Sequence, residues 1–242
     1  MVGREVDIPM HSVVRTELLG EISSGRLRPG DQVPTEPQLI HKYHVSRTTV
    51  RRALRDLETM GLIDRQPGRG SFVREPHVEP RLDRLTGFVE DMESLGLHAT
   101  ASVELIERVQ ADPQVAGQLR IDAGDLVVRV QRVRLANGTP ISFDDSYFPM
   151  ELGSRVAEEN LKDEPFYSIL EAKYGIALAG AEYVVSAAVA DEPVARLLQI
   201  QVGDPVLRLE RTSYARPDQR PILFEHLYFA GARISYRLTL DR

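Results

Sequence analysis

A cluster of basic and hydroxyl residues opens the segment Ser46–Met60, whose apolar spacing predicts a helix. Its members are Arg47, Thr48, Thr49, Arg51 and Arg52. Arginine can form paired hydrogen bonds with a guanine edge, and threonine can contact a thymine methyl group or a phosphate. These residue types suggest a surface for the major groove of DNA; the alternative is a solvated arginine face on an ordinary helix.

A basic, glycine-rich turn follows this helix. Residues 66–70, Gln-Pro-Gly-Arg-Gly, lie between two strand-like pieces, Leu62–Arg65 and Ser71–Arg74, and have the composition of a hairpin tip. Gly68 lets the backbone approach a ligand closely, and Arg69 could meet phosphates or the minor groove.

A third set of residues suggests a site for a small molecule. Arg132 and Arg134 alternate onto one face of a predicted strand, where they could hold a phosphate or a carboxylate. Asp144 lies across the Asn137-Gly138 hairpin turn and could accept hydrogen bonds from hydroxyl or amine groups. The alternative is that these charges form salt bridges with one another.

Three predicted helices and the hairpin position the first two sets. The helices cover residues 10–24, a segment that starts at Thr35, and Ser46–Met60. In the third helix, Val50, Ala53, Leu54 and Leu57 form a buried stripe at i, i+3, i+4 and i+7, which leaves the basic residues exposed. This order is typical of a winged helix-turn-helix, whose second helix of the pair enters the major groove.

An internal repeat organises the rest of the chain. Val115–Ala136 aligns with Val194–Ala215 without gaps, and Thr139–Phe148 aligns with Arg220–Phe229. Each copy is predicted to be a short helix, a Gly-Asp turn, a long strand, a hairpin turn and a second strand. The repeat predicts a largely antiparallel sheet with helices on one side, an α+β domain with pseudo-twofold symmetry. It also relates Arg211 to Arg132 and Glu225 to Asp144.

Charge separates the two parts of the chain. Residues 8–75 contain eleven basic and eight acidic residues, whereas residues 76–242 contain 18 basic and 26 acidic residues. We therefore expect a DNA-binding domain at 8–75, a proline-containing linker at 76–83, and an effector-binding and dimerisation domain at 84–242.

Composition argues against several classes of protein. The chain has 242 residues and no cysteine, which excludes disulfides and thiolate metal sites. Its six histidines are scattered, so we expect neither a metal nor a cofactor. No apolar run approaches the ~20 residues that span a bilayer, and the N-terminus lacks the apolar core of a signal peptide. We expect a cytoplasmic protein without a membrane partner.

The segment from Leu27 to Val73 resembles the DNA-binding domain of GntR-type regulators. The resemblance is carried by the Pro-Gly-Asp turn, Pro34 with Glu36, Val-Ser-Arg-x-Thr-Val-Arg and Gly-x-Gly-x-Phe-Val. It implies DNA contacts at Arg47, Thr48, Thr49, Arg51 and Gly68. The chain departs from the family pattern at Pro37, where an arginine usually follows the glutamate.

The second half resembles the effector domain of the HutC subfamily, which has a chorismate-lyase-like fold known as UTRA. Leu85–Gly96, Arg132–Pro149 and Pro165–Gly175 resemble its recurring segments. The resemblance implies an effector site at Gly87, Phe88, Arg132, Arg134, Asp144 and Tyr167, and the repeat adds Glu225 and Tyr228. Two departures, Pro165 in place of a serine and Gly-Ala-Arg-Ile at 231–234, leave a phosphosugar and another anionic or polar metabolite as alternatives.

These observations predict a DNA-binding transcriptional regulator rather than an enzyme. We expect a repressor in which a homodimer places two recognition helices on a near-palindromic operator and a small effector weakens that binding. Two rivals are an enzyme on the same fold and a constitutive architectural DNA binder. The chain has no nucleophile elbow, phosphate-binding glycine loop or metal cluster, which disfavours the enzyme.

Overall fold

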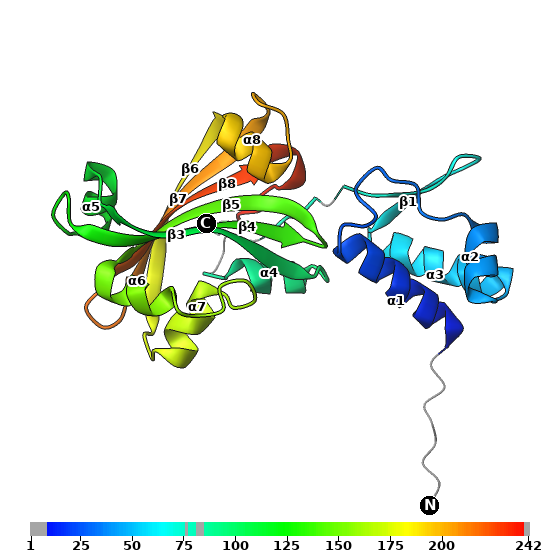
Figure 1. The fold of residues 1–242 in the computed structure, drawn as a ribbon, viewed down its shortest axis with the longest axis horizontal. Coiled ribbons are helices and arrows are strands. Elements are labelled where there is room, and N and C mark those ends of the chain that lie inside the picture. The colour runs from blue at the N-terminus through cyan, green and yellow to red at the C-terminus, as the bar shows by residue number, and fades with distance from the viewer. Residues whose placement is uncertain (1–8, 76, 81–84, 240–242) are drawn as a thin grey trace, which may run out of the picture. The chain divides into compact units, whose positions relative to one another are not determined.

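A computed structural model describes residues 9–75, 77–80 and 85–239. The chain divides into two compact units, with the boundary along the sequence between residues 76 and 77. Figure 1 labels the elements of each unit. The predicted domains and linker also include residues that the structure does not describe: Ile8, Pro76, residues 81–84 and residues 240–242.

The first unit has the predicted order of three helices and a hairpin. Its elements are α1 (Met10–Ser23), α2 (Glu36–Tyr43), α3 (Arg47–Thr59), β1 (Ile63–Gln66) and β2 (Gly70–Val73). Gln38 Oε1 accepts a hydrogen bond from the Thr35 amide at 2.8 Å, as the predicted capping pair requires. At the start of α3, Ser46 Oγ accepts from the Thr49 amide at 3.2 Å.

Helices α1 and α3 supply most of the first unit's core. The predicted stripe of α3 is buried, and it packs with apolar residues from α1, α2 and the hairpin: Val14, Leu18, Ile22, Leu39, Ile63 and Val73. His44 ends α2 in the left-handed conformation, with φ of 51°. This residue forms the sharp turn between the two helices, so that α3 presents its N-terminal half to solvent.

The second unit contains a six-stranded antiparallel sheet in the order β3-β4-β5-β8-β7-β6. The strands are β3 (Ala99–Gln110), β4 (Leu126–Ala136), β5 (Thr139–Pro149), β6 (Leu178–Val189), β7 (Pro205–Ala215) and β8 (Pro221–Ala230). Strands β5 and β8 lie at the centre, and β3 and β6 are the two edges.

The predicted repeat is confirmed as a structural duplication. Each copy has a helix, α5 (Pro113–Leu119) or α8 (Glu192–Leu198), whose N-terminus is capped by an aspartate, Asp112 or Asp191. Each helix ends in a left-handed residue with φ of 54°, Arg120 or Gln199. The duplication extends upstream of the sequence repeat, because β3 and β6 occupy equivalent edges and both have 12 residues.

Helices cover both faces of the sheet, so the prediction of helices on one side is wrong. Helices α5 and α8 pack on one face. The other face carries α4 (Phe88–Ser94), α6 (Met150–Val156), α7 (Phe166–Ser168) and the π-helix Ile169–Lys173 (Figure 1). The cause is the central strand β5, which is buried at every position from Thr139 to Ser146 and therefore needs cover on both faces.

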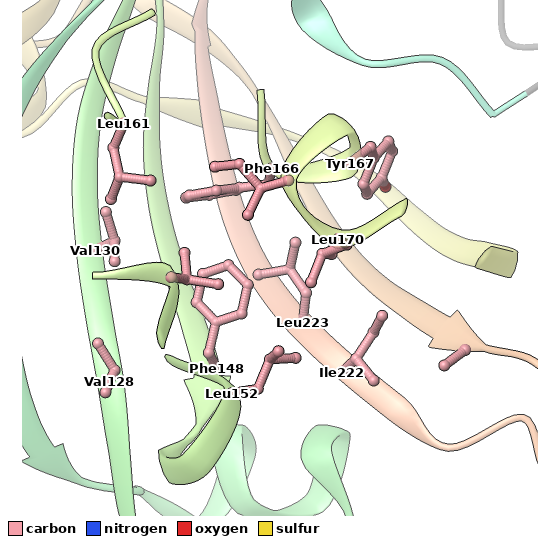
Figure 2. Packing of buried hydrophobic residues seen from close by; sticks show 13 residues of the cluster. Val128, Val130, Phe148, Leu152, Leu161, Phe166, Tyr167, Leu170, Ile222 and Leu223 are labelled. Atoms are coloured by element: carbon pink, nitrogen blue, oxygen red, sulfur yellow. The ribbon is translucent and has the colours of Figure 1, made fainter. Parts of the chain in front are cut away.

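The largest core cluster lies between the sheet and α6, α7 and the π-helix. Figure 2 shows Phe148 of β5 beside Phe166 of α7, and their rings meet edge to face with centroids 4.9 Å apart. Leu152 of α6 and Leu170 of the π-helix close the cluster. This packing fixes Phe166 and Tyr167 against the sheet, where both also reach the pocket described below.

Part of the predicted linker pairs with the C-terminal segment of the second unit. The Val78 amide donates to Arg233 O at 2.8 Å, and the Ser235 amide donates to Val78 O at 3.0 Å. Val78 is fully buried. Residues 77–80 of the predicted linker therefore form a strap bound to residues 232–237, where Val78 has apolar partners.

In the part of the chain that the structure describes, no helix combines the length and apolar character needed to cross a membrane.

Candidate functional site

The N-terminal half of α3 presents the predicted DNA-contact residues. Arg47 and Arg51 have exposed side chains, at 66% and 54%, and Thr48 and Arg52 are also exposed. Thr49 is half-buried, and its hydroxyl lies 2.9 Å from Ser46 Oγ. Thr49 therefore supports the helix cap, while its four neighbours are the groups available to a polyanion.

Glu36 gathers three arginines beside this surface. Arg51 Nε lies 3.1 Å from the Glu36 carboxylate, Arg65 Nη2 lies 3.1 Å from it, and Arg47 Nε lies 3.9 Å from it. Because Glu36 is the first residue of α2, it ties the two helices and β1 together at the face that carries the arginines. The carboxylate holds these side chains in place without cancelling their combined charge.

Contacts with Gln32 and Phe72 hold the hairpin tip in place. Gly68 has φ of +74°, a conformation that favours glycine, and Gln32 Nε2 donates to Arg69 O at 2.9 Å. A Cβ atom at Gly70 would lie 2.5 Å from Gln32 Nε2. Arg69 lies over the Phe72 ring, with its guanidinium carbon 5.8 Å from the ring centroid. The wing thus holds Arg69 at a defined, exposed position.

Pro37 stands at the second position of α2 and is exposed. A proline fits there because the first helical amides have no partner within the helix. The position of the family's usual arginine is therefore occupied by a ring that has no charge and no donor.

The second unit has a pocket between the sheet, α4, α7 and the C-terminal segment. It brings together six of the eight predicted effector residues: Gly87, Phe88, Arg132, Arg134, Asp144 and Tyr167. Its other lining residues are Pro80, Thr86, Asp91, Met92, Ser142, Pro165, Phe166, Tyr183, Arg211, Leu227, Phe229, Ile234 and Tyr236. Mixed apolar and polar linings of this kind are common in small-molecule sites.

Arg132 is the least compensated charge of the pocket. Its side chain is buried, its guanidinium carbon lies 3.5 Å from the Phe166 ring centroid, and Nη1 makes one long contact of 3.4 Å to Leu161 O. Nε is buried and has no hydrogen-bond partner among the described residues. Burial, together with the neighbouring Arg134 charge, lowers the pKa of Arg132 to about 9. An anion in the pocket would relieve this desolvated cation.

Arg134 is similar but has a nearby carboxylate. Its Nη1 lies 3.7 Å from Asp144 Oδ2, its face rests on the Phe88 ring, and within the described ranges its buried Nε has no partner. Burial lowers its pKa although Asp144 opposes this effect. Asp144 also accepts from Ser142 Oγ at 2.7 Å. Arg134 and Asp144 both line the pocket, so their ion pair is compatible with the predicted binding cleft.

The second-copy equivalents of Arg132 and Asp144, which are Arg211 and Glu225, already pair with each other. Arg211 Nη2 and Nε lie 2.6 and 2.7 Å from Glu225 Oε2, and Ser146 Oγ donates to the other carboxylate oxygen at 3.2 Å. Burial lowers the pKa of Arg211, but Glu225 and two tyrosines outweigh it and raise the pKa well above its ordinary value. Glu225 is fully buried and does not line the pocket. It supports Arg211, as the salt-bridge alternative predicts.

Tyr228 does not join the pocket. Side chains alternate along β8, so Leu227 and Phe229 face the pocket and Tyr228 faces the opposite side. There it stacks on Phe143 at a centroid distance of 5.9 Å. The assignment of Tyr228 to the effector site is therefore corrected: it packs beneath α8.

Several pocket residues were not among the predicted ones. Ser142 precedes Asp144 by two positions in β5, so the two side chains share a face and the strand period could have identified Ser142. Asp91, Tyr183 and Tyr236 come from α4, an edge strand and the C-terminal segment, which only the folded chain brings together. Asp91 accepts from Thr86 Oγ1 at 2.6 Å and adds a second carboxylate to the lining.

Arg233, which the segment 231–234 shares with the family pattern, has a structural role. Arg233 is buried and donates to Pro140 O at 2.9 Å and Leu198 O at 2.6 Å. It anchors the segment that carries Ile234 and Tyr236 into the pocket wall. Within the described ranges, no group of three or more His, Asp or Glu side chains forms a metal-binding cluster.

Comparison with known proteins agrees with both units. Residues 11–73 match the family model for bacterial regulatory proteins of the gntR family, and residues 94–235 match the model for the UTRA domain. The chain is 30% identical over 243 residues to the HTH-type transcriptional repressor NagR of Bacillus subtilis, covering 100% of this chain and 98% of that protein.

Two further relatives cover nearly the same length. The histidine utilization repressor of Pseudomonas putida is 27% identical, over 93% of this chain and 89% of its own. The crystal structure of PhnF from Mycobacterium smegmatis superposes with a TM-score of 0.66 and 27% identity, over 94% of this chain and 99% of that one.

This chain belongs to the gntR family of bacterial regulatory proteins and carries a UTRA effector domain, consistent with the HutC subfamily. It is a DNA-binding transcriptional regulator controlled by a small metabolite, and not an enzyme. The predicted fold, a winged helix-turn-helix followed by an antiparallel α+β effector domain, is confirmed.

Proposed function

We propose that this regulator is a repressor whose effector is a small metabolite with an anionic group and several hydroxyl or amine donors. The observation that carries the proposal is the pair of buried guanidinium groups, Arg132 and Arg134, whose Nε atoms lack partners among the described residues. An unpaired buried donor is costly, so a phosphate or carboxylate that accepts from both would bind strongly. NagR and the histidine utilization protein are named repressors, which supports the direction of regulation.

Other lining residues of the pocket suit the rest of such a ligand. Asp91 and Asp144 can accept hydrogen bonds, and Tyr167, whose hydroxyl lies 2.9 Å from Ser213 Oγ, offers an aromatic wall. Gly87 and Phe88 complete the lining beside Arg134. Pro165 brings neither a hydroxyl nor an amide donor to the rim, so phosphate and carboxylate remain equal candidates.

In this proposal α3 reads the operator. Arg47, Thr48, Arg51 and Arg52 face the major groove, and Gly68 and Arg69 of the wing meet the sugar-phosphate backbone. Two chains associate through their effector domains and place two such helices in successive major grooves of a near-palindromic site. Footprinting on the full operator should show two protected half-sites about one helical turn apart, whereas a single unsymmetrical half-site would contradict the dimer.

The strap of residues 77–80 offers a route for coupling. It follows the winged helix directly along the chain, and its last residue, Pro80, lines the pocket. Its backbone pairs with the segment that supplies Ile234 and Tyr236 to the same pocket. A ligand that moves this wall would therefore move the start of the second unit, which changes the constraint on the DNA-binding unit.

The effector proposal is tested by thermal shift on the full chain with phosphorylated sugars, carboxylated sugars and their uncharged parents. We expect an anionic member to raise the Tm and the uncharged parents to have no effect. The double variant Arg132→Gln/Arg134→Gln should lose the shift, and the exposed Arg108→Gln on the edge strand β3 should keep it. An equal shift for an uncharged parent, or an unchanged shift in the double variant, would contradict the proposal.

A further inference from the structure

One carboxylate lies within the basic surface that α3 presents to DNA. Glu36, at the start of α2, accepts hydrogen bonds from Arg51 Nε and Arg65 Nη2, and it lies 3.9 Å from Arg47 Nε. Its side chain is only 20% exposed, so water screens its charge in part. Because a nearby acid weakens the attraction between these arginines and phosphates, Glu36 should lower the affinity of this surface for DNA in general. Any gain in operator binding must therefore come from how the carboxylate orients the arginines.

Glu36 holds Arg51 by the inner nitrogen of its guanidinium group. Arg51 Nε lies 3.1 Å from Oε1 and 3.1 Å from Oε2, a forked contact that uses both carboxylate oxygens. Among the described residues, neither Nη1 nor Nη2 of Arg51 has a hydrogen-bond partner, and the side chain is 54% exposed. Because the guanidinium group is planar, a fixed Nε sets the direction in which the two Nη groups point.

Arg65 in turn fixes the carboxylate. It lies in β1, and its Nη2 donates to Glu36 Oε1 at 3.1 Å. Glu36 is therefore held between a residue of α3 and a residue of the hairpin, while the Thr35–Gln38 contact fixes the start of α2 beneath it. Contacts from three elements restrict the rotation of the carboxylate, so the direction of Arg51 is set before DNA binds.

A guanidinium group held in one direction favours one kind of acceptor. The two Nη groups match a pair of acceptors that lie side by side, which a guanine edge provides through N7 and O6 in the major groove. An unrelated duplex offers phosphates but no guanine at the required position. It gains nothing from the fixed direction of Arg51 and still meets the negative charge of Glu36.

We infer that Glu36 determines specificity by positioning Arg51: it lowers the affinity for DNA in general and raises the affinity for the operator. This role rests on the proposed reading of the operator by α3. A purely structural role, in which Glu36 only joins α2, α3 and β1, has a different consequence. A weakened fold would lower binding to every duplex in the same proportion, whereas loss of positioning affects the two kinds of duplex in opposite directions.

Binding of the full chain to two duplexes tests this role. One is an operator duplex that the wild-type chain selects from a random DNA pool, and the other is a scrambled duplex of the same length. At fixed salt, Glu36→Ala should bind the operator about tenfold more weakly, within the value of one paired guanine contact. It should bind the scrambled duplex about twofold more tightly, because an acid is lost from the phosphate-facing surface. A parallel loss on both duplexes, or undiminished operator binding, would overturn the inference.

Two further variants separate charge from position. Glu36→Gln removes the charge but keeps a carbonyl oxygen that can accept from Arg51 Nε. It should bind the scrambled duplex as tightly as Glu36→Ala does, yet retain most of the operator affinity. Glu17→Ala, which removes an exposed acid from α1, should leave the ratio of the two affinities unchanged. Operator binding by Glu36→Gln as weak as that of Glu36→Ala would contradict positioning through this hydrogen bond.

Dependence on Arg51 completes the test. In an Arg51→Ala background, Glu36→Ala should no longer weaken operator binding, because its effect passes through the side chain that is missing. A further loss of the same size would refute the inference. Loss of operator affinity in Arg51→Ala but not in Glu36→Ala would refute this inference alone. Unchanged operator affinity in Arg51→Ala would refute the proposed role of Arg51 in reading the operator as well.

Discussion

Arginine has two distinct uses in this chain, and the surroundings of each side chain decide which. Arg47 and Arg51 are exposed and held by one carboxylate, so they keep their charge for a polyanion at little desolvation cost. Arg132 and Arg134 are buried over aromatic rings with incomplete hydrogen bonding. Exposed arginines suit a large ligand that brings many phosphates, and buried ones suit a small ligand that replaces water.

Single substitutions in α3 separate base reading from charge. Arg47→Ala or Arg51→Ala should weaken operator binding by roughly 1–3 kcal/mol if the residue pairs with a guanine. The measurement is fluorescence anisotropy at fixed salt, with a scrambled duplex of the same length as control. Equal losses on both duplexes would mean that the residue contacts only phosphates.

At the scale of single residues, the sequence predicted the pocket best where a residue type has few structural roles. The family resemblance implied Arg132, Arg134 and Asp144, and strand period and charge indicated what they could bind. Tyr183 and Tyr236 were not predicted, because a tyrosine in an edge strand or near the C-terminus has many possible surroundings. Tyr228 lies three positions after Glu225 in β8, so strand alternation places the two side chains on opposite faces, and Tyr228 stacks on Phe143 instead of lining the pocket.

Among the elements, α6 shows how tightly the effector unit is packed. A Cβ atom at Gly153 would lie 2.5 Å from Val128 Cβ and 2.9 Å from Phe148 Cβ, so this helix contacts the sheet through a glycine. The close approach brings Leu152 into the main core and shapes the layer that carries Phe166 (Figure 2).

Alanine at Gly153 should therefore destabilise the unit. We expect Gly153→Ala to lower the free energy of unfolding by about 1–3 kcal/mol in urea denaturation, because the methyl group overpacks the interface. Gly117→Ala in α5 is the matched control: nothing lies within 4 Å of its Cβ, and alanine in a helix should add about 0.5–1 kcal/mol. Equal stability of the two variants would contradict this description of α6.

The strap makes a prediction about coupling rather than binding. Val78→Ala removes apolar contacts that hold residues 77–80 against the C-terminal segment. We expect effector affinity and operator affinity, each measured alone, to change little, while the factor by which effector weakens operator binding shrinks. The exposed Val103→Ala serves as control. An undiminished coupling factor in Val78→Ala would remove the strap from the mechanism.

The elements with strong periodicity could be predicted from the sequence, and the others could not. The stripe of α3 and the two copies of the repeat predicted seven elements that the structure contains. Strands β3 and β6 lack a clear apolar alternation because they are edge strands with few buried residues. The contacts of the strap could not be predicted, because Glu79 and Pro80 follow its one buried valine and give no apolar pattern.

At the scale of the whole molecule, the chain combines a reader of DNA with a sensor built by duplication. The duplication places Arg132 and Asp144 of the first copy and Arg211 and Glu225 of the second on one sheet. Arg211 and Glu225 pair with each other, whereas Arg132 lines the pocket and its Nε has no partner among the described residues. Divergence between the copies thus produced a single asymmetric site from a symmetric framework.

The most direct test of this account is the operator affinity of the full chain, with and without the anionic metabolite that most raises its Tm. The account predicts that the metabolite weakens operator binding of the wild-type chain at least about tenfold, within the usual range of allosteric coupling. The Arg132→Gln/Arg134→Gln variant should bind the operator normally and ignore the metabolite. Release of the double variant at the same metabolite concentration, or tighter operator binding by the wild type, would contradict the account.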